Sequence, residues 1–472
     1  MAAPGAGRHI VLADADSSPY HSLRRRAATR AERYELGRSL RNRVPRRSMA
    51  DWTPPPDRPD PVGLIEENHH GRLDRLIPIR VGRMVASPYG FLRGTAVVMA
   101  DDVARLPATG ITPVVCGDAH LGNFGFYASP ERDLVIDLND FDEAHPGGWE
   151  WDLRRLVASI WVAGRQNGAG EEQLATAVRS CVGDYRYEVR RLANEPLFSR
   201  SFSRLDVDRL AGAVAGPLRD EVVRSASRAR QRTSDRALPR FTREVGGVRR
   251  IVEEPPLITR LPDAEAEALA EALDGYLDTL STHWRRVLGG YTLLDVAHKV
   301  VGVGSVGLRA YVALLEGSSP EDVVFLQLKQ ARRSVLARYV HGESAWHAHQ
   351  GQRVVEYQQA LQTVSDPLLG WTTMDGLQYY VRQFRNMKGT IPLDAMDAEA
   401  LVDYAGVVGQ LLAKGHARTS GASMIAGYVG RSERLDDALC VFARRYADQT
   451  EADHARLVDA VNRGRLPVER GV

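Results

Sequence analysis

The sequence predicts an α+β protein with two lobes, a small one rich in β-strands and a large, mostly helical one. The chain has 472 residues, of which 44% are hydrophobic, and can bury a large core. Its mean hydropathy of −0.30 is typical of a soluble protein. Apolar residues recur with helical spacing from about 168 to 288, alternate as in strands from about 291, and return to helical spacing after about 393. We therefore expect a small lobe over 289–392 and a large lobe built from 62–288 and 393–472.

Residues 1–61 are rich in arginine and proline, which predicts an extended N-terminal arm. The arginines between Leu23 and Arg47 predict a solvated, partly helical extension. Nucleic-acid binding is the alternative for this arm, but no interleaved aromatic residues or known motif support it. The net charge of +2, from 62 basic and 60 acidic residues, also argues against a general polyanion-binding surface.

The cysteines and the apolar runs predict a cytoplasmic protein. Cys116, Cys181 and Cys440 are widely spaced and odd in number, which argues against a disulfide framework. No apolar run approaches the roughly 20 residues needed to span a bilayer. The first residues lack the layout of a signal peptide. We expect no membrane contact, and the sequence leaves the oligomeric state open.

The large lobe begins with helix and loop over 76–106, followed by a short strand, a loop and two strands around the turn "ASPERD". A helix starts at "GGWEWD", and amphipathic helices are predicted within 171–192 and 263–288. The basic segment between them predicts a loop with a small hairpin. Two further helices are predicted within 399–421 and 435–461.

The small lobe begins with a strand, a glycine-rich turn and a second strand over 295–317. A third strand, "DVVFLQLKQA", is followed by a helix over 351–364 and by two strands around the turn "TMDG". The glycine-rich turn, "GVGSVG", includes Gly302, Gly304, Ser305 and Gly307 at G-x-G-x-x-G spacing. A dinucleotide-binding loop of this spacing opens a helix, whereas here a strand follows. The pattern therefore favours a loop that covers ATP phosphates, with a plain glycine hairpin as the alternative.

Lysine is rare in this chain, which points to a special role for the few that occur. The 62 basic residues include only four lysines: Lys299, Lys329, Lys388 and Lys414. Lys329 lies in an apolar strand, and a buried ammonium requires an anion. ATP phosphates and a helix glutamate would meet that need, with Glu356 as the first choice and Glu343 as the second. The alternative is a lysine that extends to the surface.

Oxygen-bearing side chains cluster in "CGDAHLGNFGF" and "LVIDLNDFDEA". In a phosphotransferase, one Asp orients the acceptor hydroxyl and an Asn five residues later binds Mg²⁺. Asp118 and Asn123 have this spacing, and oxygen ligands suit a hard cation. Asp140 is the expected third member, with Asp142 and Asp137 as alternatives. Zinc is a poorer fit because His120 lacks an H-x-x-x-H or C-x-x-C partner pattern, and Cys116 is expected to be a packed thiol because no base lies beside it.

These motifs resemble the protein-kinase-like superfamily, in its aminoglycoside phosphotransferase and choline kinase-like branch. "CGDAHLGN" is similar to H-G-D-x-H-x-x-N, "NDFDEAHPGGWEWDLRRL" is similar to I-D-F-D-D-A…D-L-A, and "LLAKGHA" is similar to L-A-x-L-H-A. The chain departs from the pattern at Cys116, where the family has histidine, and at Asn139, where it has a hydrophobic residue. The second departure leaves open whether Asp137 or Asp140 binds the metal. The chain also resembles a bacterial domain-of-unknown-function family that carries GDAHLxNFG and DFDEA.

The order of the motifs implies a circular permutation. The catalytic pieces at 116–152 precede the glycine loop and lysine at 302–329, and joining the C-terminus to the N-terminus restores kinase order. Near, surface-exposed termini make such a permutation tolerable. By resemblance, Asp152 braces the catalytic loop, and such an Asp also caps its own helix.

The resemblance implies an ATP- and Mg²⁺-dependent phosphotransferase, with ATP-Mg²⁺ between the lobes and a small-molecule hydroxyl as the acceptor. In this assignment the glycine loop covers the phosphates, Lys329 paired with Glu356 positions them, and Asn123 and Asp140 hold Mg²⁺, with Asp142 as a further ligand. Asp118 orients the acceptor. Nucleotidyl transfer of AMP and a non-catalytic nucleotide-binding regulator are the alternatives.

The same resemblance implies roles for two longer segments. "YYVRQFRN" would supply the hinge backbone to adenine, and the helical insert at 168–288 would shape the acceptor pocket. Arg382, Arg385 and Lys388 would recognise an anionic acceptor or simply lie on the surface. The sequence does not identify the acceptor.

Overall fold

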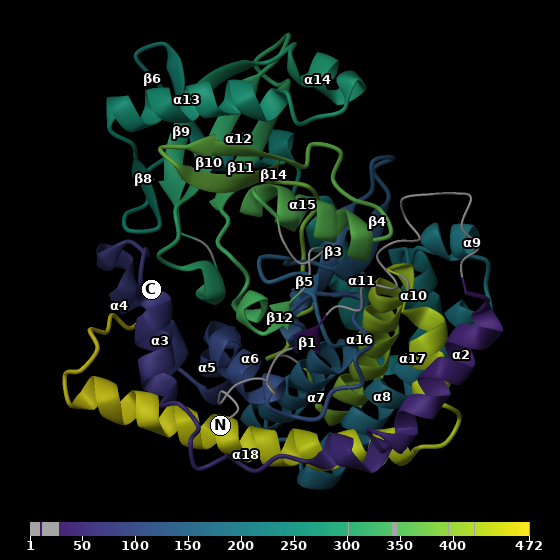
Figure 1. The fold of residues 1–472 in the computed structure, drawn as a ribbon. Helices are drawn as coiled ribbons and strands as arrows, with labels where there is room; N and C mark the ends of the chain where they lie inside the picture. The colour runs from purple at the N-terminus through teal and green to yellow at the C-terminus, as the bar shows by residue number, and fades with distance from the viewer. Residues whose placement is uncertain are drawn as a thin grey trace.

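A six-stranded antiparallel sheet forms the smaller, strand-rich part of the molecule, above a larger helical body (Figure 1). The structure is a computed structural model that describes residues 10–11, 28–300, 302–341, 347–394, 396–419 and 421–471. The sheet order is β13-β14-β11-β10-β9-β8. These strands are β8 (Ile258–Arg260), β9 (Thr292–Lys299), β10 (Ala310–Glu316), β11 (Val323–Gln330), β13 (Gly370–Met374) and β14 (Leu377–Gln383). The expected α+β class with a strand-rich part is confirmed.

The two faces of this sheet have different partners. Helix α13 (Asp263–Leu277) packs on the face that carries Tyr311, Leu328 and Tyr379. Because side chains alternate across a strand, Lys329 and its cross-strand neighbour Tyr380 lie on the opposite face. Helix α15 (Gln350–Leu361) packs against β13 and β14. β8 and α13 precede residue 289, so the strand-rich part begins earlier along the chain than the composition change at 291.

The larger body has a core of long helices that include α7 (Trp149–Gln166), α8 (Glu171–Ala193), α16 (Ala398–Arg418) and α18 (Arg434–Asn462). α16 lies against α8 at close range. A Cβ atom at Gly409 would come within 2.2 Å of the Cys181 carbonyl oxygen, so this contact requires glycine. A second close contact joins α17 (Ala422–Val429) to α2 (Arg30–Ser39), where Gly427 meets the backbone of Tyr34.

Shorter strands and helices are distributed over both parts of the molecule (Figure 1). The strands outside the six-stranded sheet are β1 (Ile10–Val11), β2 (Val114–Val115), β3 (Phe124–Ala128), β4 (Leu134–Leu138), β5 (His145–Pro146), β6 (Thr242–Val245), β7 (Val248–Ile251) and β12 (Val340–His341). The remaining α-helices are α3 (Pro61–His69), α4 (Ile77–Val85), α5 (Pro88–Gly94), α6 (Ala96–Ala104), α9 (Leu197–Ser201), α10 (Val207–Ala213), α11 (Gly216–Arg230), α12 (Ser234–Phe241) and α14 (Thr282–Leu288). The 3-10 helices are η2 (Leu40–Asn42), η3 (Arg46–Ala50), η4 (Asp74–Leu76), η5 (Leu121–Asn123), η6 (Val303–Ser305) and η7 (Val335–Arg338). β6 and β7 form the hairpin expected between the amphipathic helices.

The described part of the N-terminal segment is not the extended arm that its composition indicates. Helix α2 begins at a capping box between Thr29 and Glu32. Met49 and Trp52 are buried against the helical body. Arg58 is also buried and pairs with carboxylates of α6 and α18, which its charge alone does not reveal. A few apolar residues and paired arginines therefore anchor a segment whose composition suggests solvent exposure.

The cysteines are all buried and free. No helix within the described ranges is both long enough and apolar enough to cross a membrane.

Candidate functional site

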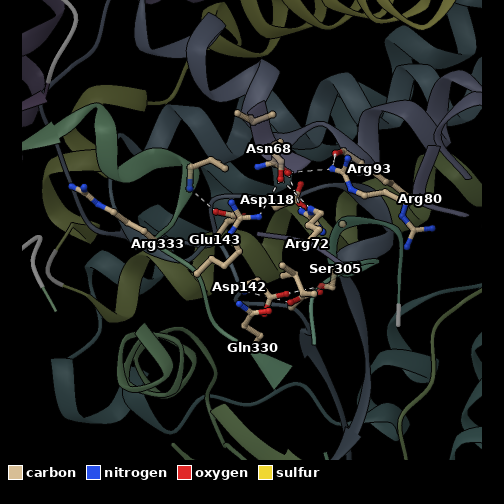
Figure 2. Close-up of a pocket in the computed structure, with 18 of the residues that line it drawn as sticks. Asn68, Arg72, Arg80, Arg93, Asp118, Asp142, Glu143, Ser305, Gln330 and Arg333 are labelled. Atoms are coloured by element: carbon tan, nitrogen blue, oxygen red, sulfur yellow. Dashed lines mark hydrogen bonds between the residues drawn. The ribbon is translucent and has the colours of Figure 1, made fainter. Parts of the chain in front are cut away.

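A pocket lies where the strand-rich part meets the helical body (Figure 2). It encloses about 740 Å³ of empty space, including its open mouth. One wall comes from the loop after β2 and the loop after β4, and a second from the glycine loop and the end of β11. A third wall comes from residues 68–97, at the ends of α3 to α6. The residues with polar chemistry are Asn68, Arg72, Arg80, Arg93, Asp118, Asn123, Asp140, Asp142, Glu143, Ser305, Gln330, Arg332 and Arg333.

Lys329 reaches the acidic motif from β11. Its side chain is only 3% exposed, its Nζ bonds to the carboxylate of Asp142, and it lies 3.6 Å from Oδ1 of Asp140. The hydroxyls of Ser305 and Tyr380 also donate to Asp142, at 2.8 and 2.9 Å. Burial alone would raise the pKa of Asp142, but Lys329 and these hydroxyls lower it to about 2. Both partners are therefore charged at neutral pH.

Asp118 follows Gly117, which has a φ of +78°. A Cβ atom at Gly117 would lie only 2.2 Å from the Glu143 carbonyl oxygen, so this position requires glycine. The Asp118 carboxylate pairs with Arg155 of α7 at 2.6 Å. Burial raises the pKa of Asp118, the charge of Arg155 offsets part of that rise, and the result is about 6. A carboxyl group with this pKa is ionised at neutral pH yet basic enough to accept a proton.

Asp152 holds the loop that carries Asp118. Its carboxylate accepts hydrogen bonds from the backbone N–H groups of Cys116 and Gly117, at 2.6 and 2.8 Å. His416 of α16 lies 3.2 Å from the same carboxylate. The expected bracing contact is therefore present. The expectation that Asp152 also caps its own helix is wrong, because the N-cap of α7 is Gly148 and the Asp152 carboxylate binds the loop instead.

Asn123 connects the two acidic loops. Its Nδ2 donates to the carbonyls of Asp118 and Asp140, at 3.0 and 3.2 Å. Asp140 is 47% exposed, and both residues line the pocket. Asp137, the alternative ligand, is buried outside the pocket and accepts hydrogen bonds from the backbone of Leu138 and Thr363. Of these two carboxylates, only Asp140 is placed to contact a ligand in the pocket.

The donor set fits magnesium better than zinc. In the described part of the chain, no three His, Cys, Asp or Glu residues are grouped to hold a metal ion. Mg²⁺ keeps several waters and is bound by one or two carboxylates together with substrate phosphates. The carboxylate of Asp140 and the amide oxygen of Asn123 supply ligands of that kind, and Asp142 lies beside them.

The glycine loop reaches this cluster through Ser305. Gly304 and Ser305 line the pocket, whereas Gly302 has no neighbour within 4 Å of a hypothetical Cβ. Gly307 has a φ of +89°, which favours glycine. The helical body contacts the loop on its other side. The Leu73 N–H donates to the Gly307 carbonyl at 2.8 Å, and Arg72 donates to the Val306 carbonyl at 2.6 Å.

The predicted pair of Lys329 with Glu356 does not form. Glu356 is exposed on α15 and accepts hydrogen bonds from His347 and Gln352, at 2.8 and 2.7 Å. Arg353, three residues earlier, is the inward residue of α15 instead. Glu343, the second choice, lies outside the described residues.

Arg353 attaches α15 to the acidic loop through backbone carbonyls. It is 1% exposed and donates to the carbonyls of Asp142 and Arg332, at 2.8 and 2.9 Å, and to that of Ala144. Arg155 and Arg353 were not predicted as site residues. The only sequence signal for either is an arginine placed within an apolar helical run.

Two further expectations do not match the pocket. The insert at 168–288 was expected to shape the acceptor pocket, but none of the lining residues comes from it. Residues within 68–97 line the pocket instead. Arg382, Arg385 and Lys388 do not line it either. Arg385 lies over the rings of Phe241 and Phe384, and Arg382 lies over Tyr380. After β14, the carbonyls of Asn386 and Gly389 accept hydrogen bonds from the backbone of β3.

Comparison with known proteins identifies a bacterial family. The model of a family described as "Uncharacterized protein conserved in bacteria (DUF2252)" matches residues 72–460, which is more than half of the chain. No curated protein and no solved structure matches it.

Proposed function

The chain belongs to the DUF2252 family of bacterial proteins, and from its pocket we propose that it is an ATP- and Mg²⁺-dependent phosphotransferase. The acceptor in this proposal is a hydroxyl group of a small molecule. One observation carries the proposal. Lys329, which lies behind the pocket wall, contacts Asp142 across 187 positions of sequence, and Asp142 lines the pocket together with Asp118 and Asn123. An ammonium, two metal-binding oxygens and a separate carboxylate are the groups that phosphoryl transfer requires.

The residues divide into three roles. Lys329 and the glycine loop hold the phosphate chain, and Asn123 and Asp140 provide ligands for Mg²⁺. Bound Mg²⁺ would neutralise charge on the phosphates. Asp118 accepts the proton of the acceptor hydroxyl while the hydroxyl oxygen bonds to the γ-phosphorus. The bond between the γ-phosphorus and the β-phosphate oxygen breaks, and ADP leaves.

We also propose that the arrangement is a circularly permuted kinase-like fold. In kinase order, a long helix leads into the catalytic loop. Here the Val114 N–H, at the start of β2, donates to the hydroxyl of Thr419, just after α16, at 3.1 Å. His416 of α16 also lies near Asp152. The helix end and the start of the catalytic segment are thus neighbours although 305 positions separate Val114 from Thr419.

The test begins with binding and ends with turnover. Mg²⁺ and ATP together should raise the Tm, because a ligand that binds only the folded state stabilises it. ADP release would then be screened across sugars, amino alcohols and peptides. Transfer of AMP to the acceptor, without ADP release, would show nucleotidyl transfer instead.

The Asp118→Asn variant should lose turnover by about 10²- to 10⁴-fold, because it cannot accept the proton. It should still bind Mg²⁺-ATP. Glu356→Gln is the matched control and should behave as the wild type, since Glu356 is remote from Lys329's hydrogen-bond partners. Undiminished turnover in Asp118→Asn would contradict the assignment of Asp118 as the base. Binding of Mg²⁺-ATP by the wild type without turnover would favour a regulator that only binds nucleotide.

A further inference from the structure

Three arginines that line the pocket donate hydrogen bonds to Asn68, and Figure 2 labels two of them, Arg72 and Arg80. These two donate to the Asn68 side-chain oxygen at 2.9 and 3.4 Å. Arg332, from the segment after β11, donates to its backbone carbonyl at 3.1 Å. The cluster therefore joins residues from the α3–α4 region with the end of a sheet strand.

None of these three guanidinium groups has a carboxylate partner among the residues that the structure describes. Their other acceptors are neutral. Arg80 donates to the Gly94 carbonyl at 2.7 Å and contacts His69 at 2.9 Å, and Arg72 donates to the carbonyl of Val306. Arg80 is 1% exposed, and its Nε has no hydrogen-bond partner. A buried charge without a counter-ion is strongly unfavourable.

The electrostatic strain shows in the pKa of Arg80, which burial lowers to about 10, with repulsion from Arg332 adding to the effect. Burial and the neighbouring Arg80 also lower the pKa of Arg72. Glu143 and Asp142 offset only part of the effect on the pKa of Arg72, and Glu143 acts in the same direction on the pKa of Arg332. Neither carboxylate forms an ion pair with the three arginines; Asp142 pairs with Lys329, and Asp118 pairs with Arg155. Arg58 shows the contrast: it is buried elsewhere and has two carboxylate partners.

We propose that Arg72, Arg80 and Arg332 form a binding site for a phosphate group. Planar guanidinium groups bind phosphate oxygens with paired hydrogen bonds and remain charged on burial better than an ammonium does. The phosphate comes from one of two sources: the phosphate chain of a nucleotide or a phosphate carried by the acceptor. The choice of these two sources rests on the proposed function, whereas phosphate binding itself can be measured without turnover.

The direct test is calorimetric titration of the full chain with inorganic phosphate, without Mg²⁺ and at constant ionic strength. Asn68→Asp is the informative variant, because it places a carboxylate of the same shape among the three arginines. We expect its phosphate affinity to fall about tenfold or more, since the new carboxylate competes for the same donors. We also expect its Tm without ligand to rise, because the arginines gain a counter-ion.

Arg332→Met should weaken phosphate binding as well. It provides a second measurement if the Asn68→Asp variant does not fold. Arg338→Met is the matched control, because Arg338 is 43% exposed and lies outside the pocket. Its phosphate affinity should equal that of the wild type. The site is refuted if wild-type protein does not bind phosphate, or if Asn68→Asp and Arg332→Met both bind it unchanged.

Titration with ATP, again without Mg²⁺, separates the two sources. A nucleotide source predicts that Asn68→Asp weakens ATP and inorganic phosphate alike. An acceptor source predicts that the variant loses phosphate binding and retains ATP binding. Absence of Mg²⁺-ATP turnover by the wild type in every assay would contradict the proposed function. The measured phosphate binding would remain valid in that case.

Discussion

At the scale of single residues, the pairing of Asp118 with Arg155 controls when the proposed base is ionised. Burial raises the pKa of Asp118 and Arg155 lowers it, with the balance at about 6. The ionised form is the one that accepts a proton. Activity should therefore be highest well above pH 6, be about half of that near pH 6, and fall further at lower pH.

Arg155→Met should move this acidic limb to higher pH, because removing the guanidinium leaves the effect of burial unopposed. A pH profile of the proposed phosphotransferase activity would measure the shift. Circular dichroism at each pH would separate it from unfolding. A limb that stays at the wild-type position would show that another group controls the profile.

At the scale of elements, two glycines set the contact between α2 and α17. A Cβ at Gly427 would lie 2.0 Å from the Tyr34 carbonyl oxygen, and one at Gly37 would lie 1.9 Å from that of Met424. The helices therefore touch backbone to backbone. Helix α2 belongs to the segment that composition assigns to an arm, so this contact is one reason why the segment is ordered.

Gly427→Ala should lower the free energy of unfolding by about 1–3 kcal/mol, because the backbones must separate. Gly212→Ala is the matched control. Gly212 lies in α10 with no atom within 4 Å of a hypothetical Cβ, so alanine there should stabilise the protein by up to about 1 kcal/mol. Urea denaturation would measure both. Equal effects of the two substitutions would contradict the close contact.

Sequence reasoning located elements better than it oriented them. Lys329 could be predicted because lysine is rare here and lies in an apolar strand, and Asp118 and Asn123 because their spacing is informative. Glu356 and Arg353 lie within one helical turn, and only the packing of α15 determines which of them is buried against the loop after β4. Arg72 and Arg80 carried no rarity signal in a chain rich in arginine.

At the scale of the whole molecule, Arg58 ties together parts of the chain that are distant in sequence. Its guanidinium pairs with Asp102 of α6 at 2.7 Å and with Asp453 of α18 at 2.5 Å. The Tyr446 hydroxyl also donates to Asp102, at 2.8 Å. The N-terminal segment, the middle of the chain and the last long helix thus meet at one buried charge cluster.

Arg58→Met should destabilise the protein by about 3–5 kcal/mol, because it leaves two buried carboxylates without their cation. The surface pair of Arg38 with Glu35 provides the control, since both side chains are 60% exposed. Arg38→Met should change the free energy of unfolding by less than about 1 kcal/mol. Similar losses in the two variants, measured by chemical denaturation, would show that the buried cluster is not special.

The backbone contacts of the glycine loop restrict how a nucleotide could enter. Leu73 and Arg72 of the helical body donate to the carbonyls of Gly307 and Val306, while Ser305 donates to Asp142. The glycine loop is therefore held both by the helical body and by the acidic motif. We expect a nucleotide that displaces the loop to break these hydrogen bonds or to shift residues 72–73 with it, so the region between α3 and α4 would take part in nucleotide entry.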